Sequence, residues 1–268
     1  MTVFDQRSKM LRRYVVDAIR GGGRGHLGSS MSMVEVLRVL YDSILRFDPK
    51  NPSSETRDRF ILSKGHGCLA LYAVLADKGF FEVAELEGFC RPTSRLGGHP
   101  ERGKVPGVEA STGALGHGLP IGVGQALALR LTRSKSRVFV LTGDGEINEG
   151  SNWEAAMAAA KHKLTNLTVL VDYNKLQSYG RTSEVLDLEP LVEKFKSFGF
   201  AVEEVDGHDI SAVEKVLRRV PFAANKPSAI ICHTVKGKGF PFAEGNPEWH
   251  HKSGLTETDI QQMYDCLK

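Results

Sequence analysis

The chain has 268 residues, of which 41% are hydrophobic, and its formal net charge at pH 7 is +3. That length allows one large buried core, so we predict a single domain over residues 1–268. The modest charge, and a basic stretch at residues 130–137 without interleaved aromatic residues, argue against nucleic-acid binding. Residues 110–129 carry no Asp, Glu, Lys or Arg, yet their glycines and Pro120 make them a poor membrane span, so no membrane partner is expected.

Two features of the sequence favour a cytoplasmic location. The first ten residues, MTVFDQRSKM, lack the apolar segment of a signal peptide. The cysteines form no C-x-x-C pair, which agrees with a reducing compartment. They are Cys68, Cys90, Cys232 and Cys266.

The first element in chain order is a helix predicted over residues 5–20, because Leu11, Val15 and Ile19 recur at helical spacing. A glycine-rich loop and a second helix over residues 32–45 follow. The loop contains GRGHLG, which satisfies the G-x-G-x-x-G pattern of dinucleotide-binding folds. That pattern requires a strand before it, whereas a helix is predicted here, so we do not expect NAD or FAD binding.

Two short apolar runs, residues 137–142 and 167–171, are rich in β-branched residues and show no polar alternation. Such runs are typical of strands that a parallel sheet buries on both faces. Between them, Ser151 is expected to cap a helix and Glu154 to reach back to the cap, which completes a βαβ unit. With further strands at residues 201–205 and 228–233 around a helix at 211–220, the predicted fold class is α/β, a parallel sheet flanked by helices.

Asp144 and Asn174 each lie just past one of these first two strands. Because parallel strands end at the same edge, the two side chains are expected to meet where open α/β sheets bind ligands. Their carboxylate and amide oxygens suit Mg²⁺ or Ca²⁺, with positions left for phosphate oxygens. Asp-Gly and Asn-Lys are also common in turns, so either residue alone is a weak signal.

Several histidines directly follow a glycine. A histidine on a glycine loop is well placed to meet a ligand, and its pKa permits proton exchange near neutral pH. Taken singly, each is more often a hydrogen-bonded loop residue. Together they predict one pocket in which histidines move protons and donate to hydroxyl groups. These residues are His26, His66, His99, His117 and His208.

The segments around these residues, in this order, resemble the amino-terminal, diphosphate-binding half of transketolase. They are GHLGSS, SKGHG, GGHPE, STGALGHG, GDGEINEG, DYNK, TVKGKG and EWHH, and they extend over nearly the whole chain. The resemblance implies a thiamine diphosphate-binding fold in which Asp144, Asn174 and the backbone carbonyl of Leu176 hold the metal. Gly143 and Gly145 would let the backbone approach the diphosphate.

Carried over residue by residue, the resemblance implies that four histidines are catalytic. His66 and His250 would contact the cofactor diphosphate, and His26 and His99 would contact hydroxyls of the donor sugar. The choice of His250 over His251 rests on register alone, because the family usually follows its histidine with glycine.

The segment from Gly113 to Gly118 would lie along the cofactor, which makes Gly113, Leu115 and Gly116 implied cofactor-binding residues. The sequence departs from the family at His117, where transketolases commonly have glutamine between two glycines. The role of His117 is therefore left open.

The resemblance ends at Lys268, whereas transketolase chains normally continue into a pyrimidine-binding domain and a carboxyl-terminal domain. The family's catalytic glutamate and most residues that hold sugar phosphates belong to those parts. We therefore expect a split transketolase, in which a second chain carries the pyrimidine-binding domain and two copies of each chain assemble. The implied reaction moves a two-carbon ketol unit from a ketose phosphate to an aldose phosphate.

Three alternatives stay open on the sequence. One is the alpha subunit of a 2-oxo-acid dehydrogenase, although SKGHG and GGHPE fit transketolase better. Another is a split transketolase-like enzyme for an unusual sugar, such as a sulfonated or branched one. The third is a non-catalytic subunit that keeps the cofactor pocket to stabilise an assembly.

Overall fold

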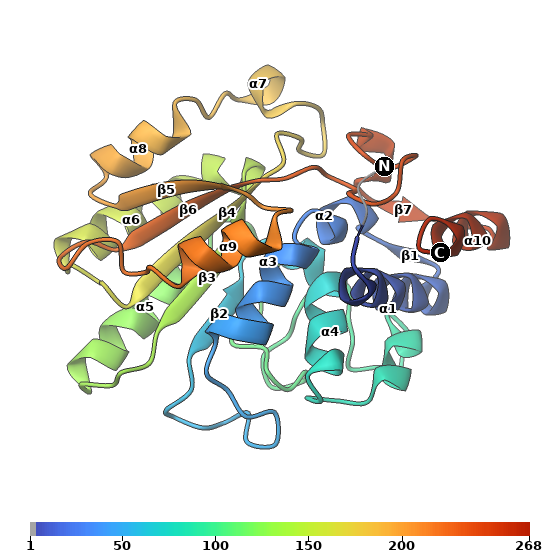
Figure 1. Ribbon diagram of the computed structural model, residues 1–268, viewed down its shortest axis with the longest axis horizontal. Helices are drawn as coiled ribbons and strands as arrows, with labels where there is room; N and C mark the ends of the chain where they lie inside the picture. The colour runs from blue at the N-terminus through green and yellow to red at the C-terminus, as the bar shows by residue number, and fades with distance from the viewer. Residues whose placement is uncertain (1–3) are drawn as a thin grey trace.

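The computed structural model describes residues 4–268 and has a five-stranded parallel sheet at its centre (Figure 1). The strands follow the order β2–β3–β4–β6–β5 across the sheet, and every neighbouring pair is parallel. The predicted fold class is therefore confirmed. The strands are β2 (Arg59–Leu62), β3 (Val138–Gly143), β4 (Leu167–Tyr173), β5 (Ala201–Asp206) and β6 (Ser228–His233).

Helices occupy most of the chain between and around these strands (Figure 1). They include short 3₁₀ segments and one π-helical turn, all labelled η. The α-helices are α1 (Gln6–Gly22), α2 (Leu27–Met31), α3 (Val34–Val39), α4 (Cys68–Asp77), α5 (Gly118–Leu131), α6 (Gly150–Lys161), α7 (Thr182–Val185), α8 (Leu191–Ser197), α9 (Ile210–Leu217) and α10 (Glu257–Asp265), and the others are η1 (Leu40–Ile44), η2 (Gly65–Gly67), η3 (Val83–Gly88), η4 (Gly145–Asn148) and η5 (Pro247–Trp249).

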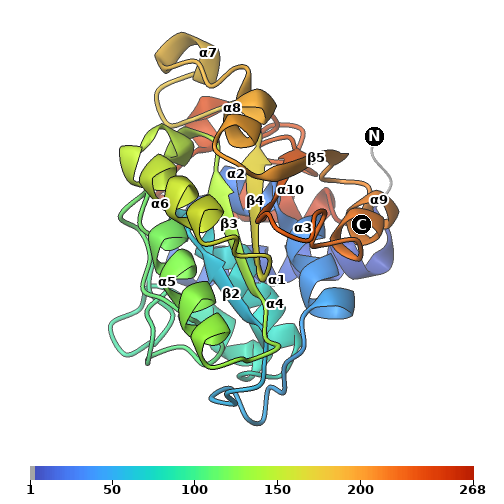
Figure 2. The same ribbon diagram turned by 90° about the vertical axis from the view of Figure 1, so that its left-hand side faces the viewer.

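The helices form a layer on each face of the sheet (Figure 2). On one face α5, α6 and α8 pack against strand side chains such as Val140 and Val169. On the other face α1, α3, α4 and α9 pack near Phe139 and Leu170. Neighbouring positions along a strand thus point into opposite cores, which explains why the strands show no polar alternation.

The βαβ unit predicted from the sequence is present, with α6 between the parallel strands β3 and β4. Its predicted cap is wrong. The helix begins at Gly150, after Glu149, and no side chain caps it. Ser151 lies inside the first turn, and its hydroxyl donates to the backbone oxygen of Gly116 at 2.8 Å. The Ser151 hydroxyl therefore holds the neighbouring loop at Gly116 and does not form the predicted cap with Glu154.

A small second sheet joins distant parts of the chain. In it β1 (Arg24–Gly25) pairs antiparallel with β7 (Lys252–Ser253). The predicted glycine-rich loop thus holds a strand, and the helical region expected at residues 32–45 begins already at Leu27. Local sequence contains no signal for β1 because its partner lies near the other end of the chain.

The segment before GRGHLG is helix α1, which confirms the prediction that a helix, and not a strand, precedes this motif. Strand β2 lies outside the predicted elements, because four residues are too few to show a period. No helix in the described part of the chain is both long and apolar enough to cross a membrane.

Candidate active site

A cavity of about 200 Å³ lies at the carboxyl edge of the sheet, beyond the ends of β3 and β4. Asp144, Asn174 and Leu176 line it together, as predicted for the metal ligands. They meet because β3 and β4 are parallel and in register, with Gly143 opposite Asp172. Other predicted residues on its wall are His66, Gly113, Leu115, Gly143, Gly145 and His250.

The predicted metal ligands present oxygen atoms with unused lone pairs. The Asp144 carboxylate accepts the backbone N–H groups of Gly145 at 2.7 Å and Lys175 at 2.5 Å. Asn174 Oδ1 accepts the backbone N–H of Leu176 at 3.1 Å. Each of these oxygens can take another partner. Burial raises the pKa of Asp144 to about 6, and a bound divalent cation would favour its ionised form.

Two buried lysines face the same cavity, and neither is among the residues predicted from the sequence. The ammonium of Lys236 donates to the carbonyl oxygen of Leu176 at 2.7 Å, which shows that this oxygen accepts a cationic partner. Lys64 donates to the carbonyl oxygen of Ser29 at 3.0 Å and pairs with Asp172. Lys64 lies in the segment SKGHG and Lys236 in TVKGKG, so the resemblance of these segments to transketolase was the signal that could have identified the two lysines. Two cations in one cavity suit a polyanionic ligand.

The cavity also contains polar atoms that the protein leaves unused. Within residues 4–268, the buried atoms His250 Nδ1 and Gln177 Nε2 have no hydrogen-bond partner. Buried polar atoms are nearly always paired, so an unpaired donor on a cavity wall indicates a ligand. Together with the lysines and the oxygen ligands, these atoms fit a metal–diphosphate group.

Glycines shape the wall of this site. Gly113 has a φ of +144°, and a Cβ atom there would lie 2.7 Å from the His99 ring, so only glycine lets the histidine pack closely. Gly116 does not line either cavity of the site. Its N–H donates to the buried Glu146 carboxylate at 3.0 Å, so this residue positions the loop.

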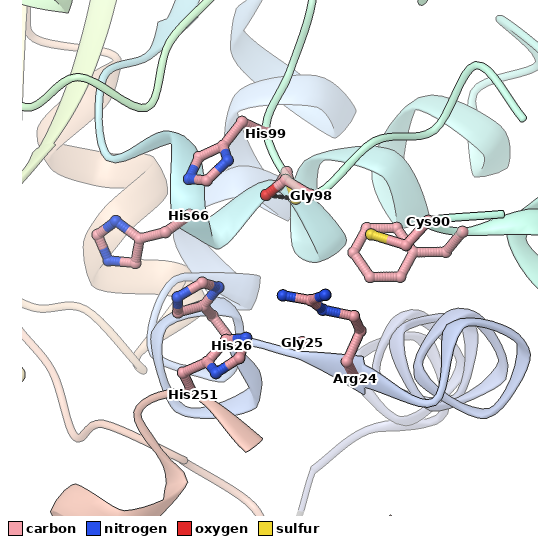
Figure 3. Close-up of a pocket in the computed structure, with 10 residues that line it drawn as sticks. Arg24, Gly25, His26, His66, Cys90, Gly98, His99 and His251 are labelled. Atoms are coloured by element: carbon pink, nitrogen blue, oxygen red, sulfur yellow. Dashed lines mark hydrogen bonds between the residues drawn. The ribbon is translucent and has the colours of Figure 1, made fainter. Parts of the chain in front are cut away.

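Predicted catalytic histidines converge beside this cavity. A second cavity of about 250 Å³ adjoins it and is lined by His26, His66, His99 and His251 (Figure 3). The ring centre of His26 lies 5.3 Å from that of His66, 6.3 Å from His99, 5.4 Å from His250 and 4.6 Å from His251. His250 lines the first cavity and His251 the second.

Burial lowers the pKa of four of these rings, those of His26, His66, His99 and His250, and so favours their uncharged form at neutral pH. It lowers the pKa of His26 to about 4, an effect that the neighbouring His251 and His99 reinforce. The pKa of His250 falls to about 3, and those of His66 and His99 are also lowered, in each case chiefly by burial. A neutral imidazole has both a donor and an acceptor nitrogen, which suits exchange of protons with hydroxyl groups.

The expectation that all glycine-preceded histidines share one pocket is wrong for two of them. His117 is exposed, and its Nδ1 contacts the backbone oxygen of Leu115 at 3.0 Å. His208 pairs with the buried Glu35 at 3.0 Å on the side of the sheet covered by α1 and α3. A preceding glycine places a histidine on a turn but does not decide which way the turn faces.

The parallel sheet, the candidate oxygen ligands at its carboxyl edge and the adjoining histidines are the features expected of one class of protein, a thiamine diphosphate-binding α/β domain. Residues 5–267 match the family described as "Transketolase, thiamine diphosphate binding domain". The chain therefore belongs to the transketolase family, as its sequence segments indicate.

Among its relatives, an apulose-4-phosphate transketolase subunit from Actinobacillus succinogenes is 46% identical, over 92% of this chain and 90% of that protein. A 6-deoxy-6-sulfo-D-fructose transketolase subunit from a Clostridium species is 40% identical, over 94% of this chain and 91% of that protein. The solved transketolase of Campylobacter jejuni superposes with a TM-score of 0.90 and 30% identity, covering 99% of this chain and 43% of that one. The chain spans about two fifths of the length of that solved transketolase.

Proposed function

We propose that this chain is the amino-terminal, diphosphate-binding subunit of a two-chain transketolase. Thiamine diphosphate, when bound, supplies the carbon nucleophile by which a ketose is cleaved and its two-carbon ketol unit is carried to an aldose. The observation that carries the proposal is one cavity in which oxygen ligands, buried lysines and unpartnered donors adjoin a cluster of neutral histidines.

In this proposal the first cavity anchors the cofactor. Asp144, Asn174 and the carbonyl oxygen of Leu176 would hold Mg²⁺, or Ca²⁺ in its place, because hard oxygen donors suit these ions. The unpartnered His250 Nδ1 and Gln177 Nε2 would donate to diphosphate oxygens. The two lysines would offset the charge of the diphosphate.

The adjoining cavity would receive the sugar. His26 and His99 would hydrogen-bond its hydroxyl groups, and His66, which lines both cavities, would lie between sugar and diphosphate. Because each ring is neutral, its free nitrogen lone pair can take a hydroxyl proton and its N–H can return one. His26, His66 and His99, together with His250 at the diphosphate, are the four proposed catalytic histidines, which thus move protons and orient the substrate.

A second polypeptide would supply the pyrimidine-binding domain and most contacts to the sugar phosphate. Similarity to relatives named as transketolase subunits supports this division of the enzyme between two chains. An assembly of two copies of each chain follows from sites that lie between subunits.

The proposed substrates are a ketose phosphate and an aldose phosphate. A second candidate is the same reaction on an unusual sugar, which is supported by relatives named for apulose-4-phosphate and for 6-deoxy-6-sulfo-D-fructose. The family match favours transketolase over a 2-oxo-acid dehydrogenase. The intact histidine cluster favours an enzyme over a non-catalytic subunit.

The test is to purify the tagged chain from its native cells, identify a stoichiometric companion and assay ketol transfer with thiamine diphosphate and Mg²⁺. We expect a companion related to the pyrimidine-binding half of transketolase, and activity that neither chain shows alone. A chain that purifies alone and transfers no ketol unit from any ketose would contradict the proposal.

The metal assignment is tested by Asp144→Asn, which preserves size but removes the anionic ligand. We expect cofactor-dependent turnover to fall more than about 100-fold while the fold persists, because a metal ligand contributes at least as much as the groups that support it. Asp48→Asn, an exposed carboxylate before β2, is the matched control and should have no effect. Full turnover of the Asp144 variant at saturating Mg²⁺ would refute the assignment.

A further inference from the structure

Arg24 lies at the end of the histidine-lined cavity away from the metal ligands. It belongs to β1, where pairing with Ser253 of β7 fixes the backbone. The next residue, Gly25, is buried with a φ of +156°, and a Cβ atom there would lie 2.8 Å from Leu69 Cδ1. The turn between Arg24 and His26 is therefore held tightly, so both side chains are directed to the same cavity (Figure 3).

Within residues 4–268, the guanidinium of Arg24 is free for a ligand. Figure 3 shows it beside His26 and Cys90 without a hydrogen bond to any residue drawn there. Among the described residues that line this cavity, none is an aspartate or a glutamate. The positive charge of Arg24 is thus uncompensated within the cavity, in contrast to the buried Arg12 of α1, which is paired with Glu35.

The two cavities share part of their wall. His26 and His66 line both, whereas Arg24 lines only the second and the metal ligands line only the first. A ligand that reaches from the diphosphate site into the second cavity would therefore pass the histidines first and meet Arg24 last. Along this path such a ligand would first meet the proposed metal and diphosphate site, then the histidine rings and then the Arg24 guanidinium.

We infer that Arg24 binds the anionic end group, a phosphate or a sulfonate, of the sugar substrate, an inference that rests on the proposed ketol transfer. The planar guanidinium donates two parallel N–H bonds to a tetrahedral oxyanion, which fixes orientation as well as charge. Through Arg24, this chain helps to determine which sugars react. The exposed position of Arg24 also attracts the anion toward the histidines.

The test compares Arg24→Leu and Arg24→Lys with the native chain, each purified with its companion and loaded with thiamine diphosphate and Mg²⁺. Arg91→Leu is the matched control, because Arg91 is a nearby exposed arginine whose guanidinium donates to the carbonyl oxygen of Gly21 and does not line the cavity. The probes are D-fructose 6-phosphate, 6-deoxy-6-sulfo-D-fructose and the neutral ketose erythrulose, and both binding and turnover are measured.

We expect Arg24→Leu to lower the preference for the favoured anionic donor over erythrulose, taken as the ratio of kcat/KM values, by about 10- to 100-fold. Arg24→Lys should lose less, because it keeps the charge without the two-pronged geometry. The control should keep the native ratio. The stronger of the phosphate and sulfonate effects identifies the end group.

The outcomes separate this inference from the proposed function. An unchanged ratio in an active Arg24→Leu enzyme would overturn the role of Arg24 and leave ketol transfer standing. No turnover of any ketose, together with anionic-sugar binding that Arg24→Leu weakens at least tenfold, would overturn ketol transfer and uphold the anion site. Neither turnover nor Arg24-dependent binding would overturn both.

Discussion

Apart from the exposed His117, the histidines that follow glycine occupy two very different regions of this protein. Around the candidate active site, His26 and His66 crowd together with His250, which has a buried nitrogen without a partner in the described chain. Beneath α1 and α3, His208 lies in a network where its ring nitrogens are both used. The same short sequence pattern thus gives an open binding site in one place and a closed structural junction in the other.

The structural junction joins four parts of the chain through buried charges. Arg12 donates to Glu35 at 2.5 and 3.0 Å and to the backbone oxygen of Lys238 at 3.2 Å. His208 Nε2 accepts the backbone N–H of Val235 at 2.9 Å, so its Nδ1 carries the proton that it donates to Glu35. The network therefore anchors the backbone on both sides of the cavity lysine in TVKGKG.

The comparison shows that buried polar groups have two different roles in this fold. Where burial is accompanied by complete pairing, the groups stabilise the native state and fix neighbouring loops. Where buried polar atoms stay unpaired around a cavity, they lower the stability of the native state, and a bound ligand that pairs with them restores it. Variants of the two regions should therefore affect different measurements.

The largest expected loss of stability comes from Glu35→Gln. This change leaves the Arg12 guanidinium buried without its counter-ion and should lower the free energy of unfolding by about 3–5 kcal/mol. Urea denaturation measures it. In the control Glu214→Gln, the same substitution removes an exposed pair with Arg218 and should cost less than about 1 kcal/mol. Equal losses in the two variants would mean that the buried network contributes nothing special.

A smaller loss is expected for His208→Leu, which leaves the Val235 N–H unpaired and takes a donor from Glu35. We expect about 1–3 kcal/mol of destabilisation, with weaker thiamine diphosphate binding because Lys236 is the next residue. His208→Gln offers an amide donor and a carbonyl acceptor, so it should recover most of both losses. If leucine and glutamine behave alike, the hydrogen bonds of His208 do not position this segment.

At the active site, a substitution should affect cofactor affinity more than the stability of the fold. His250→Asn removes a ring whose Nδ1 has no partner in the described chain, so the free energy of unfolding should change by less than about 1 kcal/mol. The dissociation constant for thiamine diphosphate should rise about tenfold, through loss of a charge-assisted hydrogen bond. Calorimetric titration of His250→Asn with thiamine diphosphate measures this dissociation constant, and His162→Asn, at an exposed position, is the control. Unchanged affinity would contradict the role of His250.

The mildest test is the pH dependence of stability. Burial holds the pKa of His26 at about 4 and of His250 at about 3, against an ordinary value of 6.5, so only the unfolded chain takes up protons there as the pH falls below 6.5. Stability should therefore decrease with falling pH between about 6.5 and 3. For Glu35, burial would raise the pKa, but the charge of Arg12 outweighs it and holds the pKa at about 2, so its contribution is lost only as the pH falls from 4.5 toward 2.

Urea midpoints measured from pH 7.5 to 4 check the first of these windows. His26→Asn should flatten the decrease because it removes one group that must stay neutral in the folded state. His162→Asn should leave the slope unchanged, since His162 is exposed. A slope that is the same in all three proteins would show that the clustered histidines do not control acid stability.

Much of the fold was predictable because its signals are local. The apolar runs of β3 and β4 identify strands buried on both faces, and Asp144 and Asn174 follow them closely enough to be placed at one edge. The elements that escaped prediction are those without a local signal. β1 exists only because β7 supplies its hydrogen bonds, and β2 is too short to show a pattern.

The site was predictable to the extent that residues lie in recognisable segments. Lys64 and Lys236 are inside two of those segments, but nothing in the sequence tells a solvated lysine from one that faces a cavity. Ser151 has the residue type of a helix cap, yet a nearby carbonyl oxygen takes its hydroxyl. In each case a contact between distant segments overrode a sound local preference.

By itself the sequence determined the α/β class, the parallel pairing of the central strands and the edge where Asp144 and Asn174 meet, because strand period and chain direction are encoded locally. A preceding glycine alone does not decide which histidines share the site, and only the tertiary structure showed where each ring lies. His26 and His208 both follow a glycine, yet the first lies beside a cavity and the second beside Glu35. Their difference arises from packing between segments far apart in the chain. Packing also pairs Arg12 with Glu35, whereas Figure 3 shows Arg24 without a hydrogen bond to the residues drawn there.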